Sequence, residues 1–259
     1  MTGRGPAEPH ASAFAEDRDV ADTVVVVTGA GGGIGSATAG LLLAAGARVV
    51  AGDLREHALS DLASRWGTDR VATCVGDVRE PATADALVTT GVERFGRVDS
   101  IVANAAVGFY GGILDVTPEQ VDLMVDVNVK GTVWLARAAV AQFRRQGDGG
   151  DIVVLGSVAG LMIGGGAEAV YAATKAAQIN LATALDREVR AEGIRTTVIA
   201  PAGVNTPFAA ADGRFQGGDP EDGPFMHPGD IASAVVHTLR QPRRMRTELW
   251  TMWSLAEEH

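Results

Sequence analysis

The chain has 259 residues, of which 46% are hydrophobic and 21% are charged, and its formal net charge at pH 7 is −10. Such an excess of acidic side chains repels nucleic acid and anionic membranes, so neither is expected as a partner. The length and the hydrophobic content suffice for one large core, and residues 22–259 are expected to form a single domain.

The first 21 residues are expected to form a disordered tail, because they are small, charged and proline-containing. They lack the apolar core of about 7–15 residues that a signal peptide needs, and no apolar stretch approaches the ~20 residues of a membrane span. The single cysteine, Cys74, has no partner for an internal disulfide, which fits a reducing cytoplasm. The five histidines lie singly, without other ligands at metal-binding spacings, so no metal site is expected. We therefore expect a cytoplasmic protein.

Short β-branched runs alternate with longer helical patterns along the whole chain. The predicted strands are residues 23–28, 48–52, 70–75, 98–103, 150–156, 195–200 and 247–252. The predicted helices are residues 34–46, 55–65, 81–95, 117–146, 170–192 and 228–240. This alternation is typical of right-handed βαβ units. It predicts an α/β fold with a doubly wound, mostly parallel, seven-stranded sheet that carries helices on both faces, as in a Rossmann fold.

The first predicted strand ends in a glycine-rich turn that opens the first helix. Residues 28–35 read Thr-Gly-Ala-Gly-Gly-Gly-Ile-Gly, a pattern that lets backbone N–H groups and a helix N-terminus meet a pyrophosphate. The second predicted strand ends at Asp53, 18 positions past Gly35. A Rossmann unit places there the carboxylate that accepts hydrogen bonds from the adenosine ribose. Together the two features predict a dinucleotide site, which the pair Tyr171 and Lys175, described below, identifies as a nicotinamide site.

Asp53 also bears on the choice between the two nicotinamide dinucleotides. Its carboxylate suits the ribose 2′-hydroxyl of NAD and would repel the 2′-phosphate of NADP, and residues 30–33 contain no lysine or arginine. Arg55, two residues further on, could either pair with such a phosphate or lie exposed at a helix start. We expect NAD as the cofactor, with NADP less favoured.

Tyr171 and Lys175 are one helical turn apart, on one face of the predicted helix 170–192. An alcohol gives up hydride only if its hydroxyl proton also leaves, and a phenol is a poor base at its ordinary pKa of ~10. Lowering this pKa by ~2–3 units requires roughly 3–4 kcal/mol of preferential phenolate stabilisation. The Lys175 ammonium and an oxidised nicotinamide can supply it. Tyr171 is therefore predicted as the general acid/base, and Lys175 also as a donor to the nicotinamide ribose.

Two further polar residues are candidates for the same site. Ser157 follows the fifth predicted strand, where its hydroxyl is placed to hydrogen-bond a substrate oxygen. Asn128 lies inside the fourth predicted helix, where a side chain that holds a water beside Lys175 would give the proton an exit. Each of the two, taken alone, is equally well explained as an ordinary polar residue.

Residues 203–227 do not fit the alternation of strands and helices. The segment is long for a connection inside a compact domain, and it combines glycines and prolines with Phe208, Phe215 and Phe225. Because it follows the sixth strand, at the sheet edge where ligands bind, we interpret it as a mobile substrate cover. The three phenylalanines are then the expected substrate contacts. A disordered insertion is the alternative.

From about residue 22 to residue 252 the chain resembles the short-chain dehydrogenase/reductase family, in its ordinary single-domain branch. The resemblance rests on a TGxxxGIG loop and an Asn-Ser-Tyr-Lys tetrad with Tyr-x-x-x-Lys spacing, formed by Thr28, Gly29, Gly33, Ile34 and Gly35 and by Asn128, Ser157, Tyr171 and Lys175. It implies further cofactor contacts at the adenine, the adenosine half and the carboxamide, from Asp77 and Val78, from Asn104, and from Pro201, Val204 and Thr206. It also implies a homo-oligomer, either a tetramer or a dimer.

The chain departs from the family pattern at several positions. Ser157 precedes Tyr171 by one residue more than is usual, and Ala106 and Ala202 stand where glycine is usual. Residues 248–253, with two tryptophans, replace the glycine-rich ending of many members. The C-terminal wall of the substrate pocket is therefore not predictable by analogy.

The expected function is NAD(H)-dependent interconversion of a secondary alcohol and a ketone, a small-molecule substrate of moderate size and apolar character. One alternative is an NADPH-dependent reductase of 3-oxoacyl thioesters or polyketides, with the basic cluster Arg243, Arg244 and Arg246 as a docking patch for an acyl carrier protein. Another is a non-catalytic protein that binds a dinucleotide as a sensor. The intact pair of Tyr171 and Lys175 argues against it.

Overall fold

The computed structural model describes residues 17–161, 166–208 and 224–256. Its strands are β1 (Val24–Thr28), β2 (Arg48–Asp53), β3 (Val71–Val75), β4 (Ser100–Ala103), β5 (Gly150–Leu155), β6 (Ile194–Pro201) and β7 (Leu249–Met252). Its α-helices are α1 (Gly33–Ala44), α2 (Glu56–Trp66), α3 (Pro81–Phe95), α4 (Pro118–Met124), α5 (Gly131–Gln146), α6 (Ala169–Val189) and α8 (Pro228–Arg240). Each predicted strand is found close to its expected bounds, and each predicted helix lies where the pattern placed it.

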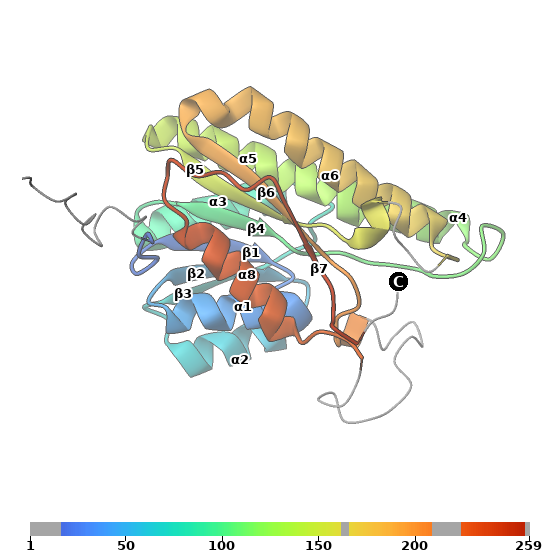
Figure 1. Ribbon diagram of the computed structural model, residues 1–259. Coiled ribbons are helices and arrows are strands. Elements are labelled where there is room, and N and C mark those ends of the chain that lie inside the picture. Colours follow the sequence, from blue (N-terminus) through green and yellow to red (C-terminus); the bar gives the residue numbers. More distant parts are fainter. Residues whose placement is uncertain (1–16, 162–165, 209–223, 257–259) are drawn as a thin grey trace, which may run out of the picture.

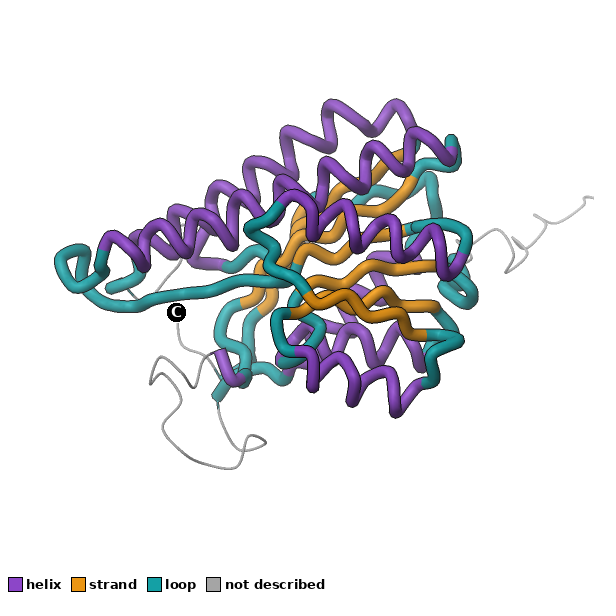
Figure 2. The backbone as a smooth tube through the Cα atoms, turned by 180° about the vertical axis from the view of Figure 1, so that it is seen from behind, coloured by secondary structure: helices purple, strands orange, loops and turns teal. Residues whose placement is uncertain are grey.

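The seven strands form one sheet in the order β3-β2-β1-β4-β5-β6-β7, and each neighbouring pair is parallel. Helices α1, α2 and α8 cover one face of this sheet, and α3, α5 and α6 cover the other (Figure 1, Figure 2). The predicted doubly wound α/β fold is therefore confirmed. The chain order reverses between β1 and β4, and sheets of this kind bind ligands in the crevice at that point, beyond the carboxyl ends of the strands.

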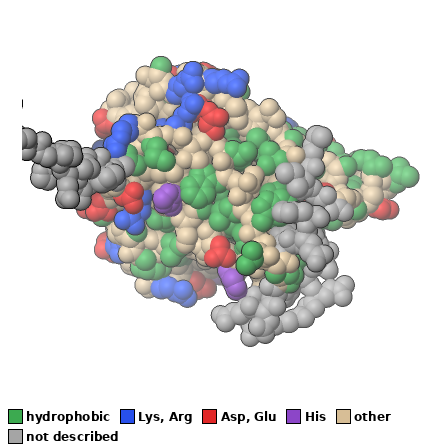
Figure 3. Space-filling model, viewed as in Figure 1, with side chains coloured by type: hydrophobic (Ala, Val, Ile, Leu, Met, Phe, Trp, Pro, Cys, Tyr) green, Lys and Arg blue, Asp and Glu red, His purple; other side chains and the backbone are tan. Residues whose placement is uncertain are grey.

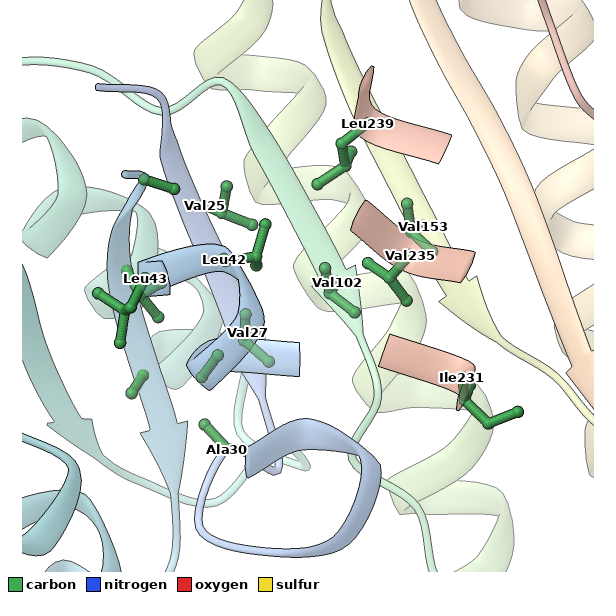
Figure 4. Packing of buried hydrophobic residues seen from close by; sticks show 14 of the residues in the cluster. Val25, Val27, Ala30, Leu42, Leu43, Val102, Val153, Ile231, Val235 and Leu239 are labelled. Carbon is green, nitrogen blue, oxygen red and sulfur yellow. The ribbon is translucent and has the colours of Figure 1, made fainter. Parts of the chain in front are cut away.

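Alternate residues of the central strands supply two hydrophobic cores, one on each face of the sheet. Val25 and Val27 of β1 pack with side chains of α1, α2 and α8, among them Leu42 (Figure 4). Val24 and Val26 pack on the opposite face with side chains of α3, α5 and α6. All four valines are fully buried. Burial on both faces explains why β1 reads as an uninterrupted apolar run.

Residues 17–21 belong to the folded domain, so the prediction of a disordered tail over residues 1–21 is wrong for this part. Val20 is buried in the core shared by α1 and α8. The Arg18 backbone N–H donates to the Arg240 carbonyl at 2.6 Å, and the Arg18 guanidinium pairs with Asp151 at 2.9 Å. These partners lie far along the chain, so local composition gave no sign of them. Residues 1–16 lie outside the described residues.

The predicted helix 117–146 is divided into α4, a π-helical segment (Val125–Lys130) and α5. Thr117 and Gln120 form a capping box at the start of α4, each side chain accepting the backbone N–H of the other residue. A π-helical turn inside a helix is frequent at functional sites. Here the turn contains Asn128.

The segment between β4 and α4 projects from the body of the domain (Figure 1). It exposes Ile113 and Leu114, and hydrophobic side chains gather at the tip of this projection (Figure 3). In the described part of the chain, no helix combines the length and the apolar character that a membrane span requires. No three His, Cys, Asp or Glu side chains come together as metal ligands in those same ranges.

Candidate active site

A cleft of about 1090 Å³ opens at the carboxyl ends of the strands. The glycine loop after β1 and the ends of β2 and β3 form one half, and the segments after β4, β5 and β6 form the other half with α6. Most residues predicted for the site line this cleft: Gly29, Gly33, Ile34, Asp53, Asp77, Val78, Asn104, Ser157, Tyr171, Lys175, Pro201, Val204, Thr206, Phe208 and Phe225. Thr28, Gly35 and Asn128 do not line it directly.

The glycine loop is folded tightly against the segment that follows β4. Gly29 adopts a φ of +66°, and a Cβ there would lie 2.8 Å from the Asn104 amide nitrogen. A Cβ at Gly35 would overlap the Gly29 carbonyl oxygen. Asn104 donates its side-chain amide to the Thr28 carbonyl at 2.9 Å, and the Thr28 hydroxyl accepts the backbone N–H groups of Asn104 and Ala105 at 3.1 and 3.2 Å. Thr28 and Gly35 therefore shape the loop from behind.

Asp53 ends β2 at the rim of the glycine loop. One carboxylate oxygen accepts the Gly31 backbone N–H at 2.9 Å, and the other accepts the backbone N–H and the Nε of Arg55, both at 3.0 Å. Desolvation raises the pKa of this carboxyl, but the hydrogen bonds from Arg55 and Gly31 more than offset it, so the pKa is lowered overall. Arg55 therefore forms an ion pair with Asp53 at the rim of the cleft. Its half-exposed side chain is held by Asp53.

The end of β3 repeats this arrangement. Asp77 accepts the backbone N–H and the Nε of Arg79 at 2.9 and 2.8 Å. The side-chain hydrogen bond from Arg79 is the main cause that lowers the pKa of the Asp77 carboxyl. Asp77 and Val78 line the same cleft as Asp53. Their contact with an adenine stays a prediction.

Tyr171 and Lys175 lie on the face of α6 that borders the cleft, as predicted. Tyr171 is 7% exposed, and its ring packs against those of Tyr110 and Phe208, with centroid distances of 5.3 and 6.1 Å. Ser157, which follows β5, borders the same part of the cleft. Three of the four predicted catalytic side chains therefore line one region of the cleft.

Lys175 is almost completely buried, and its Nζ donates to the Leu155 carbonyl at 2.8 Å. The same Nζ lies 5.6 Å from the centroid of the Tyr171 ring. Burial lowers the pKa of Lys175 to about 7, because desolvation penalises the ammonium more than the neutral amine. Lys175 therefore exchanges its proton close to neutral pH.

This lowered pKa predicts how the stability of the unliganded protein depends on pH. Between about pH 7 and pH 10 the unfolded chain keeps the Lys175 proton and the folded chain loses it, so the free energy of unfolding rises with pH, by up to about 1.4 kcal/mol per pH unit from this group. Below pH 7 both states are protonated and the slope vanishes. Urea unfolding at pH 7 and pH 9 should show this rise in the wild type and not in Lys175→Met. Parallel pH profiles for the two proteins would contradict the assignment.

Asn128 is fully buried. Both the oxygen and the nitrogen of its side-chain amide form hydrogen bonds within the protein. Its Oδ1 accepts the Val107 N–H at 2.9 Å, and its Nδ2 donates to the Val107 carbonyl at 2.8 Å and to Thr174 Oγ1 at 3.0 Å. Thr174 Oγ1 in turn donates to the Tyr171 carbonyl at 2.7 Å. The Asn128 side chain therefore clamps the segment after β4 to α6, close to Tyr171. Its part in a proton exit stays a prediction.

The predicted substrate cover, residues 203–227, is described at its two ends. Val204 pairs with Met226 in a single parallel bridge, so these two ends lie together beside β6. Phe208 and Phe225 line the cleft. Residues 209–223, which include Phe215, lie outside the described residues, and a mobile cover stays a prediction.

Among the lining residues that the sequence did not predict for the site are three with large polar or aromatic side chains, Tyr110, Glu168 and Trp253. The segment that carries Tyr110 is joined to the start of α6 by a hydrogen bond from the Gly111 N–H to the Ala167 carbonyl, at 2.7 Å. Trp253 directly follows β7 and supplies the C-terminal wall. An aromatic residue just past the last predicted strand, in a chain with only 5% aromatic residues, was a usable signal for this wall.

Comparison with known proteins identifies relatives of this chain. A family model for short chain dehydrogenases matches residues 23–216. An uncharacterized oxidoreductase of Staphylococcus aureus (strain USA300) is 34% identical over 224 residues, which cover 86% of this chain and 94% of that protein.

Two solved structures show the same likeness. The closed form of a serine dehydrogenase complexed with NADP⁺ matches with a TM-score of 0.84 at 25% identity, covering 92% of this chain and 97% of that one. A short chain dehydrogenase from Mycobacterium paratuberculosis bound to NAD gives a TM-score of 0.81 at 28% identity, over 92% and 98% of the two chains. With the Rossmann-like sheet and the cleft at its switch point, these matches show that the chain belongs to the short-chain dehydrogenase family of oxidoreductases.

Proposed function

We propose that this enzyme interconverts a secondary alcohol and a ketone with NAD(H), and that Tyr171 is its general acid/base. One observation carries the proposal: Tyr171 and Lys175 border the cleft from one face of α6, with Ser157 on the adjoining wall. A phenol with a lysine one turn away suits the removal of an alcohol proton. The relatives bound to NADP⁺ and NAD support a nicotinamide dinucleotide in this cleft.

The lining of the cleft fits such a cofactor. The start of α1 presents backbone without side chains, because a Cβ at Gly31 would lie 2.8 Å from the Asp53 carboxylate and one at Gly32 would lie 3.1 Å from Arg55. Backbone N–H groups at this helix N-terminus suit a pyrophosphate. We assign the adenosine ribose to Asp53 and the nicotinamide ribose to Lys175. The remaining contacts are assigned to Asp77, Val78 and Asn104 toward the adenosine and to Pro201, Val204 and Thr206 toward the carboxamide.

Tyr171, Ser157 and Lys175 have different roles in the transfer of the hydroxyl proton. The nicotinamide, when bound, supplies the hydride acceptor or donor. In the oxidative direction the Tyr171 phenolate takes the hydroxyl proton of the alcohol, while the Ser157 hydroxyl donates to the same oxygen. The Lys175 ammonium favours phenolate over phenol, because an opposite charge within about 6 Å stabilises the charged form. In the reductive direction Tyr171 returns its proton to the carbonyl oxygen.

The pair formed by Asp53 and Arg55 supports NAD over NADP. A carboxylate within ~4 Å of a phosphate that bears nearly two negative charges faces repulsion of several kcal/mol at an effective dielectric near 20. Arg55 offsets part of this repulsion, but its guanidinium already donates to the Asp53 carboxylate. A 2′-phosphate would have to compete with that carboxylate for the same arginine.

The reductase of carrier-bound 3-oxoacyl groups finds less support. Its expected docking patch is partly neutralised, because Arg246 pairs with both Asp186 and Glu248 and Arg243 pairs with Asp151, a carboxylate that Arg18 and Arg195 share. Of the three arginines in the cluster, two are therefore engaged with acidic side chains. A non-catalytic sensor would not require a buried lysine beside a tyrosine in the cleft.

A substrate panel tests the proposed function. Secondary alcohols with NAD or NADP, and ketones with the reduced cofactors, should change the absorbance at the reduced-cofactor band. The largest kcat/KM values are expected with NAD and NADH. Absence of turnover for every alcohol and ketone, with cofactor binding retained, would instead favour the dinucleotide sensor.

A further inference from the structure

The part of the cleft near Tyr171 contains an acidic side chain that the proposed reaction does not use. Among the lining residues that the structure describes, five are charged: Asp53, Arg55, Asp77, Glu168 and Lys175. The first three follow β2 and β3, on the side assigned to the adenosine. Glu168, just before α6, and Lys175, within α6, stand on either side of Tyr171 in the sequence. Glu168 is therefore the one carboxylate of the described lining on the substrate side.

Glu168 is the N-cap of α6 and stands three residues before Tyr171 and seven before Lys175. All three residues line the cleft. At a rise of about 1.5 Å per residue, Glu168 stands roughly 4.5 Å along the axis from Tyr171, on the side away from Lys175. A substrate whose oxygen meets Tyr171 thus extends toward Glu168 with the part that points away from the nicotinamide ribose.

The backbone before α6 is bent where Glu168 enters the cleft. Gly166 and Ala167 have φ values of +85° and +55°, and for alanine this left-handed conformation is strained. The hydrogen bond from the Gly111 N–H to the Ala167 carbonyl holds the bend. The bend therefore directs the chain so that Glu168 lines the cleft.

Aromatic rings form the neighbouring wall of the cleft. Tyr110, Tyr171 and Phe208 lie with ring centroids 5.3 to 6.4 Å apart. A cation is attracted both to aromatic faces and to a carboxylate, whereas an anionic substrate group would be repelled by Glu168. The formal net charge of −10 also raises the local concentration of cations near the surface.

We propose that Glu168 receives a protonated amine of the substrate, so that the substrate class is an amino alcohol or the corresponding amino ketone. The inference rests on the alcohol and ketone chemistry proposed above and specifies its substrate. The reacting oxygen lies at Tyr171 and Ser157, and the ammonium group lies between the Glu168 carboxylate and the aromatic wall.

Matched substrates test this inference. 1-Amino-2-propanol and 2-butanol differ by an ammonium in place of a methyl group, 4-amino-2-butanol and 2-pentanol form a longer pair, and 3-hydroxybutyrate supplies a carboxylate. In at least one pair the wild type should prefer the amine by about tenfold or more in kcat/KM, and 3-hydroxybutyrate should be the poorest substrate. Glu168→Gln should lower the ratio of amine to alkanol by about tenfold or more. Glu188→Gln removes the same charge from an exposed position on α6 and should keep the ratio.

A binding measurement separates this inference from the proposed function. In calorimetric titrations of the complex with NADH, 1-amino-2-propanol or 4-amino-2-butanol should bind the wild type about tenfold more tightly than Glu168→Gln. Turnover of alcohols with no preference for the amines, and with a ratio that Glu168→Gln does not change, would overturn the inference and leave the proposed function standing. Absence of all turnover, with amine binding that depends on Glu168, would overturn the function and keep the amine site. Binding of the amines that is independent of Glu168 would overturn the amine site in either case.

Discussion

Tyr171→Phe is expected to lower kcat by about 1000-fold or more while leaving the affinity for NADH nearly unchanged. The substitution removes the hydroxyl that takes and returns the proton, a contribution typically worth about 10²–10⁴ in rate. It keeps the ring, whose contacts with Tyr110 and Phe208 fill this wall of the cleft. Steady-state kinetics with the best alcohol of the panel gives kcat, and fluorescence titration gives the affinity for NADH.

The chain offers a matched control for this variant. Tyr110 is the other of its two tyrosines, and its ring lies 5.3 Å from that of Tyr171. Tyr110→Phe removes the same group from the same wall and should lower kcat by less than about tenfold, because no proton transfer is assigned to it. Dehydrogenation retained within tenfold in Tyr171→Phe would show that another group is the base.

Asp53→Ala is expected to weaken the binding of NAD and to strengthen the binding of NADP. It removes a charge-assisted hydrogen bond to the adenosine ribose. The binding of NAD should therefore weaken by about 1.5–3 kcal/mol, or roughly 10- to 150-fold in affinity. It also removes the repulsion of a 2′-phosphate and releases Arg55 from its partner, so NADP should bind more tightly. The preference for NAD over NADP, measured as the ratio of kcat/KM for the two cofactors, should become smaller or reverse.

Asp77→Ala is the matched control for this effect. Asp77 is paired with Arg79 as Asp53 is paired with Arg55, at the end of the next strand of the sheet. We assign it to the adenine, which NAD and NADP share. Its loss should therefore weaken the binding of both cofactors and leave the ratio of their kcat/KM values unchanged. An unchanged ratio in Asp53→Ala as well would remove Asp53 from the choice of cofactor.

The features of the site that were predictable from the sequence are those that short segments encode. The glycine loop and Asp53 are set by one βαβ unit, and Tyr171 and Lys175 are set by the spacing of a single helix. Each of these patterns places its side chains without information from the rest of the chain. The doubly wound parallel sheet follows in the same way, because alternating strands and helices with right-handed crossovers allow few arrangements.

The rest of the site depends on contacts between distant segments. Tyr110 and Glu168 meet the cleft because a hydrogen bond between Gly111 and Ala167 joins their loops, and no local pattern records that bond. The clamp formed by Asn128 and the pairing of Arg55 with Asp53 depend likewise on side-chain geometry. The sequence predicts residues 17–21 as part of a disordered tail, because their composition does not reveal the distant partners that order them, Asp151 and Arg240.

Transfer of deuterium from the cofactor to the substrate tests the central claim most directly. The wild type is incubated with a ketone of the panel and with NADH that carries deuterium at both C4 positions, and the alcohol is analysed by mass spectrometry and NMR. We predict an alcohol with one deuterium on the carbinol carbon, formed faster than with equally labelled NADPH and lost in Tyr171→Phe. An alcohol without deuterium, no alcohol at all, or faster transfer from NADPH would contradict the claim that this chain is an NAD(H)-dependent alcohol and ketone oxidoreductase.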